Sequence, residues 1–81
     1  SYEKAAASLE EAATELAEYR AQLKGTIPAL ATSATQAYDS GQYNNAILLF
    51  EKIQAIEPDN ETVKIYLPRA RNRQKALEKM R

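Results

Sequence analysis

Two glycines and three prolines are the only strong helix breakers in this sequence, and their positions constrain its fold more than any other feature. They are Gly25, Pro28, Gly41, Pro58 and Pro68. The stretches between them are dominated by Ala, Glu, Lys, Leu, Gln and Arg, which all favour helix. No stretch alternates β-branched and polar residues as a half-buried strand does. The sequence therefore predicts an all-α fold of about four helices in a single domain, residues 1–81.

The predicted helices have ordinary globular lengths and short connections, which favour antiparallel neighbours. They cover residues 2–24, 28–39, 43–56 and 61–79. Gly25 is expected to end the first helix at positive φ. Asp59 is expected to cap the last helix, because an aspartate oxygen accepts from free N–H groups in the first turn. Pro68 is expected to kink that helix or split it in two, because proline lacks the N–H donor.

The first predicted helix carries an apolar seam whose residues alternate spacings of three and four. The seam consists of Tyr2, Ala5, Leu9, Ala12, Leu16, Tyr19 and Leu23. All seven positions therefore share one helix face. We expect this face to pack inside the same chain, as an N-terminal packing helix. Sustained heptad spacing is also a coiled-coil signal, so oligomerisation through the seam is the alternative.

Residues 27–60 span 34 residues and contain a predicted helix, a tight turn, a second helix and a proline near the end. This segment resembles a tetratricopeptide repeat, in which small and aromatic residues recur at fixed positions of a 34-residue unit. The matching residues are Ala34, Tyr38, Gly41, Tyr43, Ala46, Phe50 and Pro58. The resemblance implies an antiparallel helical hairpin with the two alanines at the helix crossing.

The resemblance is weaker outside the second half of the unit. Leu30 and Ser33 stand where the family pattern has a large aromatic residue and a leucine. Residues 61–81 match a second repeat poorly, so we expect them to form a basic capping helix. Residues 1–25 precede the unit without a glycine turn of their own, and are expected to pack against it as a single helix.

The family presents the first helix of each hairpin to a concave groove that holds a peptide or a helix. Carried onto this sequence, the resemblance places the partner-binding groove at Thr32, Thr35, Asp39, Thr62, Tyr66, Arg69 and Arg73. Some family members grip a terminal carboxylate with Lys and Asn. Ala31 and Thr35 occupy the matching positions here, so that clamp is absent.

Catalytic chemistry has few candidate residues in this chain. Histidine and cysteine are both missing, which removes the commonest general base, the commonest metal ligand and the thiolate nucleophile. Glu11 and Glu15 are four residues apart, a common arrangement on solvated helix faces. The Asp59–Glu61 segment lacks the spacing of a calcium loop. We therefore expect no enzyme, no cofactor, no metal and no small-molecule substrate. No run of 18 apolar residues suggests a transmembrane segment.

Charge is distributed unevenly along the chain although the net charge is zero. Residues 64–81 hold seven of the eleven basic side chains and one acid, whereas residues 1–18 hold five acids and one base. No aromatic residue lies between Arg69 and Arg81, which disfavours base stacking and hence nucleic acid. We expect a non-catalytic scaffold for protein–protein interaction whose partner is a protein or peptide, with an acidic segment as the first choice. Binding of the basic helix to nucleic acid or anionic membrane remains the other alternative.

Overall fold

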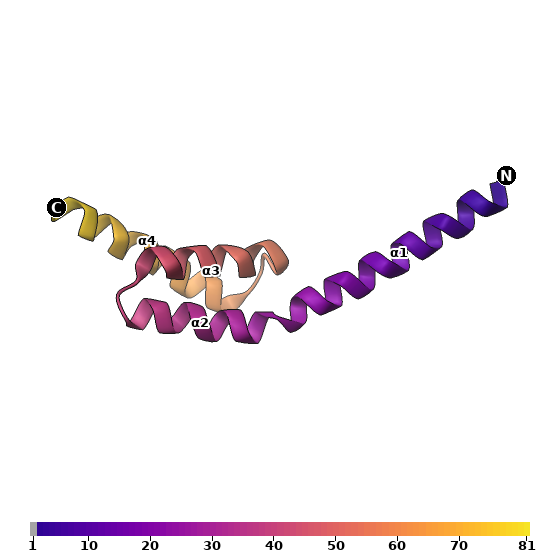
Figure 1. The fold of residues 1–81 in the computed structure, drawn as a ribbon. Helices are drawn as coiled ribbons and strands as arrows, with labels where there is room; N and C mark the ends of the chain where they lie inside the picture. The colour runs from indigo at the N-terminus through magenta and orange to yellow at the C-terminus, as the bar shows by residue number, and fades with distance from the viewer. Residues whose placement is uncertain (1) are drawn as a thin grey trace.

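The computed structural model contains four α-helices joined by connections of one, three and four residues (Figure 1). They are α1 (Tyr2–Gly25), α2 (Ile27–Asp39), α3 (Tyr43–Ile56) and α4 (Glu61–Lys79). The structure describes the backbone of residues 2–81 and the side chains of residues 14–81. Within these residues there is no strand, which confirms the predicted all-α fold built around a helical hairpin.

The turn between α2 and α3 depends on Gly41, which has a φ of +79°. This left-handed conformation is open to glycine but strained for other residues. Its N–H donates to the Tyr38 carbonyl oxygen at 3.1 Å, and the N–H of Gln42 donates to the Ala37 carbonyl oxygen at 2.8 Å. The carbonyls of Ala37 and Tyr38 at the end of α2 are thereby satisfied, and α3 returns antiparallel along α2. The predicted role of Gly41 is confirmed.

The core lies where α2, α3 and α4 meet. Its fully or almost fully buried residues are Ala34, Ala46, Phe50, Ile53, Val63, Leu67 and Ala70. Ala34 and Ala46 have no exposed surface, because their small side chains let α2 and α3 approach closely. Phe50 is also completely buried, as expected from its helical spacing. Tyr38 is half-buried and packs against the edge of this core.

The N-terminus of α4 is capped by Asn60, not by Asp59 as the sequence suggested. The Asn60 Oδ1 atom accepts a hydrogen bond from the N–H of Val63 at 3.0 Å. Asp59 is exposed in the preceding turn. That turn closes when the Asn60 N–H donates to the Glu57 carbonyl oxygen at 3.1 Å. The turn after Pro58 therefore contains one more residue than expected, and the N-cap lies one position later in the chain.

Pro68 lies inside α4 without dividing it, so the expected alternative of two shorter helices is wrong. The helix runs from Glu61 to Lys79. Pro68 leaves the Lys64 carbonyl without its intrahelical donor. Both residues are exposed, so water can hydrate that carbonyl and the loss of one hydrogen bond does not leave a buried polar group.

Helix α1 does not fold back onto the hairpin, contrary to the expectation of antiparallel neighbours. It leaves α2 as a separate arm, and the whole chain extends over 65 Å (Figure 1). Only Thr26 separates the two helices, and its φ of −82° and ψ of −14° are helix-like. A single residue in this conformation cannot reverse the chain. Gly25 is the last residue of α1 and does not adopt the expected positive φ.

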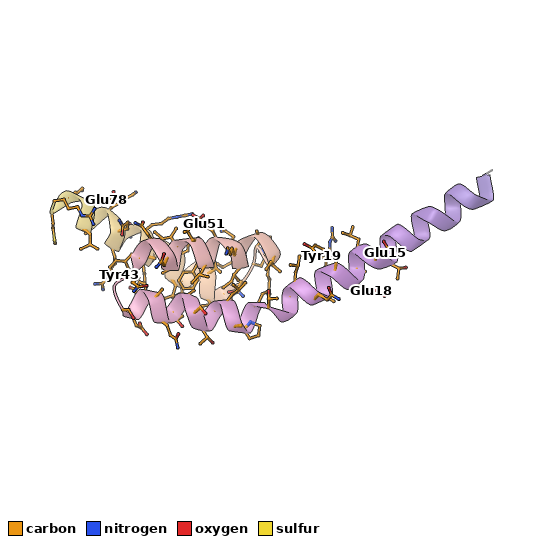
Figure 2. The ribbon with its side chains drawn as sticks, viewed as in Figure 1. Glu15, Glu18, Tyr19, Tyr43, Glu51 and Glu78 are labelled. Atoms are coloured by element: carbon orange, nitrogen blue, oxygen red, sulfur yellow. The ribbon has the colours of Figure 1, made fainter. Side chains whose placement is uncertain are left out.

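The apolar seam of α1 is buried only where the arm joins the hairpin. Leu23 is half-buried and lines a shallow hollow with Ala55 and Ile56 of α3. Leu16 and Tyr19 are 50% and 58% exposed, and Tyr19 projects from the arm in Figure 2. The seam side chains of Tyr2, Ala5, Leu9 and Ala12 lie outside the described residues. Packing within the chain is therefore limited to the C-terminal end of the described seam.

Candidate partner-binding face

The seven residues expected to form a groove come from α2 and α4, which contact each other. We call their surface the α2–α4 face; it consists of Thr32, Thr35, Asp39, Thr62, Tyr66, Arg69 and Arg73. On α4 these residues share one side of the helix, since each residue advances about 100° around the axis. From Thr62 to Arg73 the face extends about 16 Å at 1.5 Å per residue.

The orientation of α2 follows from the residues that line its other edge. Ser33, Gln36 and Ala37 line a hollow between α2 and α3. Thr35 lies about 160° around the helix from Ala37, and it is half-buried. Thr35 is therefore on the edge nearer α4, while Thr32 is exposed on the outer side of the same edge.

Tyr66 forms part of the wall of the face and is only half-buried. Its ring is stacked on Phe50 with centroids 5.6 Å apart and an interplanar angle of 15°. It also meets Tyr38 edge-on, with centroids 5.4 Å apart. Offset-stacked and edge-to-face pairs are the arrangements that aromatic quadrupoles favour. Tyr66 therefore connects the buried core to the exposed basic residues of α4.

Arg73 lies beside two tyrosines, Tyr38 at the end of α2 and Tyr43 at the start of α3. A hydrogen bond to the side chain of Tyr38, together with the Coulombic effects of Tyr38 and Tyr43, raises the pKa of Arg73 above its usual value. Tyr38 and Tyr43 also contact each other edge-on at a centroid distance of 5.6 Å. The guanidinium is exposed and lies close to both tyrosines. Tyr43 was absent from the predicted site, because only the fold brings it near α4.

The two threonines of α2 direct their hydroxyl donors back to their own helix. Thr32 Oγ1 donates to the Pro28 carbonyl oxygen at 3.0 Å, and Thr35 Oγ1 lies 3.0 Å from the Ala31 carbonyl oxygen. Such bonds are common for threonine within helices. The hydroxyl oxygens keep lone pairs that can accept from a partner, but their protons are already engaged. The threonines therefore supply shape and acceptors to the face, and Arg69 and Arg73 supply its donors.

The α2–α4 face is basic and its cations are not neutralised within the described part of the chain. The ion pairs among residues 14–81 are Lys64–Glu61 at 3.8 Å and Arg71–Glu51 at 3.4 Å. Neither includes Arg69 or Arg73, which stand four residues apart on α4 as neighbours on the helix surface. Asp39 is the one acid of the face and is exposed. The face is therefore suited to a partner that brings carboxylates.

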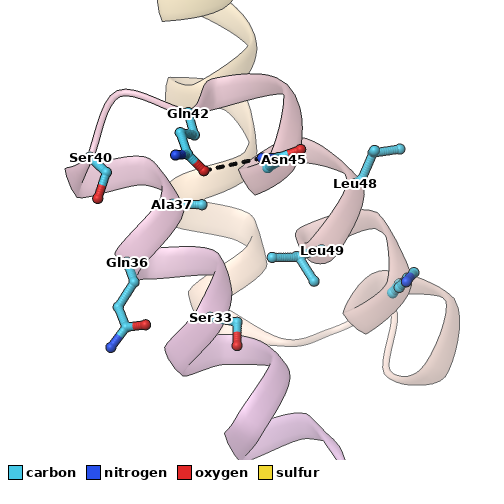
Figure 3. A pocket seen from close by; sticks show the side chains of 9 residues that line it. Ser33, Gln36, Ala37, Ser40, Gln42, Asn45, Leu48 and Leu49 are labelled. Atoms are coloured by element: carbon cyan, nitrogen blue, oxygen red, sulfur yellow. Dashed lines mark hydrogen bonds between the residues drawn. The ribbon is translucent and has the colours of Figure 1, made fainter.

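A second concave surface, between α2 and α3, was not anticipated from the sequence (Figure 3). Its lining is mostly small, amide and hydroxyl side chains: Ser33, Gln36, Ala37, Ser40, Gln42, Asn45, Leu48, Leu49 and Lys52. Asn45 Nδ2 donates to Gln42 Oε1 at 3.1 Å across its rim. Leu48 is 58% exposed. The sequence signal for this surface was a leucine outside the helical spacing of the core residues of α3. No acid lines the hollow, and Lys52 is its one charged residue.

The described residues contain no cluster suited to holding a metal ion. No group of three or more His, Cys, Asp or Glu side chains converges within residues 14–81. In the same range every buried side-chain nitrogen or oxygen has a hydrogen-bond partner. Over the residues that the structure describes, no helix combines the length and apolar character that a membrane span requires.

Comparison with known proteins identifies no relative: no family model, no curated protein and no solved structure matches this chain. Function is therefore inferred from the geometry and charge of the α2–α4 face. The feature that distinguishes this face from the rest of the surface is a pair of exposed arginines next to a half-buried aromatic cluster.

Proposed function

We propose that this chain is a non-catalytic protein-interaction module that binds an acidic helix or peptide on the α2–α4 face. The observation that supports this most is Arg73, which is exposed and lies beside Tyr38 and Tyr43. Its planar guanidinium can offer two parallel donors to a carboxylate. Arg69 and Tyr66 lie next to it along α4, so a partner would meet charge and apolar surface together.

The proposal includes membership of the tetratricopeptide class of helical hairpins for residues 27–60. Burial of Ala34, Ala46 and Phe50 and the positive φ of Gly41 support it, since the family pattern requires small residues at the crossing and glycine in the turn. A hairpin of this kind buries one face on its neighbours and leaves another open to partners. In this chain the open face would be the basic α2–α4 face.

The test is a titration of the full chain with an acidic helix-forming peptide and with a generic DNA duplex at about 150 mM salt. Arg69→Ala combined with Arg73→Ala should weaken peptide binding about 3- to 30-fold, which corresponds to about 0.3–1 kcal/mol for each exposed charge. The matched control is Lys64→Ala with Lys75→Ala. It removes the same charge from the opposite side of α4, and it should leave peptide binding within twofold.

Two results would reject the proposal. Equal weakening by the arginine and lysine variants would mean that only net charge matters. Tight duplex binding that disappears with Arg69→Ala and Arg73→Ala, without any peptide binding, would instead indicate a nucleic-acid module. Binding to phosphates would also fall steeply with salt, because neutralising each phosphate releases counterions.

A further inference from the structure

The exposed arm α1 carries an acidic edge directly beside its apolar seam. Glu11, Glu15 and Glu18 follow helical spacing, one position before the seam residues at 12, 16 and 19. Glu15 and Glu18 are exposed and belong to none of the ion pairs of residues 14–81 (Figure 2). The arm therefore offers carboxylates and apolar surface that a partner could cover.

The complementary surface is the side of α4 that belongs to the α2–α4 face. Arg69 and Arg73 occupy successive turns of this side, and Leu77 and Met80 continue it toward the C-terminus. Leu77 is 39% exposed and Met80 is 79% exposed. Arg69 and Arg73 lie about one helical turn apart, as Glu15 and Glu18 do, and on each helix apolar residues lie beside the charged pair.

These two surfaces cannot meet within one molecule. The arm leaves one end of the hairpin and the C-terminal half of α4 leaves the other (Figure 1). Among the described residues, helix α1 has no contact with α4, although both touch α2. The single linking residue, Thr26, is helical in conformation and cannot turn the arm back. The acidic edge and the basic face of one chain are therefore available only to other molecules.

We propose that the occupant of the α2–α4 face is helix α1 of a second copy of this chain, in a head-to-tail contact. The proposal rests on the function proposed above and names its partner. The acidic edge with Glu15 and Glu18 lies against Arg69 and Arg73 of the next molecule, and Leu16 and Tyr19 meet Leu77 and Met80 there. A contact between two different surfaces is heterologous, so each assembly keeps one free arm at one end and one free face at the other, and association continues into chains.

The experiment uses the full chain in two charge-reversed forms. The arm variant is Glu15→Lys with Glu18→Lys, and the face variant is Arg69→Glu with Arg73→Glu. The control is Lys64→Glu with Lys75→Glu, on the opposite side of α4. Circular dichroism verifies the helix content of each variant. Glu15→Gln with Glu18→Gln replaces the arm variant if the lysines reduce helicity. Sedimentation equilibrium then gives the average mass against the monomer mass of 9.0 kDa.

The unmodified chain and the control should show a mass that rises with concentration and falls as salt increases from about 0.05 to about 0.5 M. The arm and face variants should each be monomeric. An equimolar mixture of the two should associate again, because the lysines of the reversed arm meet the glutamates of the reversed face and the unmodified arm meets the unmodified face. This outcome is specific to a head-to-tail contact.

Other outcomes overturn the inference. A face variant that still self-associates while the arm variant does not would indicate a coiled coil between two α1 seams. A monomer under all conditions would also refute the head-to-tail contact. Acidic-peptide binding in that case would leave the proposed function intact, whereas loss of both self-association and peptide binding would refute the proposed function as well.

Discussion

Truncation of Phe50 tests whether the three-helix core described here stabilises the chain. Phe50 is completely buried and stacked on Tyr66. Replacing a buried phenylalanine by alanine costs about 3–5 kcal/mol, from lost burial and the cavity left behind. Residues 27–81 form the packed body, and at about 0.05–0.15 kcal/mol per residue their free energy of unfolding is about 3–8 kcal/mol. Phe50→Ala should therefore unfold a large fraction of the molecules even without denaturant.

A milder substitution makes the magnitude measurable by urea titration with circular dichroism. Ile53→Val at a completely buried site should cost about 0.5–1.5 kcal/mol. With a urea dependence of about 1 kcal/mol per molar, the midpoint should fall by about 0.5–1.5 M. Leu48→Ala is the control on the same helix, because Leu48 is 58% exposed and surface changes stay within about 0.5 kcal/mol. Equal midpoints for the Phe50, Ile53 and Leu48 variants would refute the assignment of the core.

The remaining predictions concern the turn, the cap and the site. Gly41→Val should lower the free energy of unfolding by about 1–2 kcal/mol, because valine is strained in the left-handed conformation, and the same urea titration measures this loss. Gly25→Ala should stabilise α1 by about 0.5–1 kcal/mol, which circular dichroism detects as increased helix content. Asn60→Ala should lose about 0.5–2 kcal/mol of stability, and Asp59→Ala almost none, so a reversed order in thermal unfolding would contradict the observed cap. Tyr38→Phe removes the hydroxyl beside Arg73 but keeps the ring. It should weaken acidic-peptide binding about 2- to 10-fold, or about 0.5–1.5 kcal/mol, and unchanged calorimetric affinity would show that this hydroxyl does not position the arginine.

The hairpin and the helices were predictable because their determinants are local. Helical spacing of apolar residues and the scarcity of glycine and proline define each helix within its own segment. Gly41 could be identified as the turn, since a short connection between antiparallel helices requires a residue that tolerates positive φ. Ala34, Ala46 and Phe50 were correctly expected at the crossing, because residues of one helix face become the core once two helices pack.

The path of the arm was not predictable from the same local signals. Gly25 and Pro28 mark the boundary between α1 and α2 correctly, but a boundary does not specify the angle of the chain beyond it. That angle depends on Thr26, whose helix-like φ and ψ continue the direction of the chain. The cap at Asn60 was misplaced for a similar reason, because one additional residue in the turn after Pro58 changes which side chain faces the free N–H groups.

The sequence by itself determined four helices, the hairpin turn and the opposite charges of the two ends, because each depends on residues close together in the chain. The tertiary structure decided which of these features can meet. It brings Tyr38 and Tyr43 to Arg73, about thirty residues away, and it keeps the acidic arm far from the basic side of α4. Contacts between distant segments depend on how the helices pack and on the direction of each connection, and neither quantity is encoded in the spacing of residues along one helix.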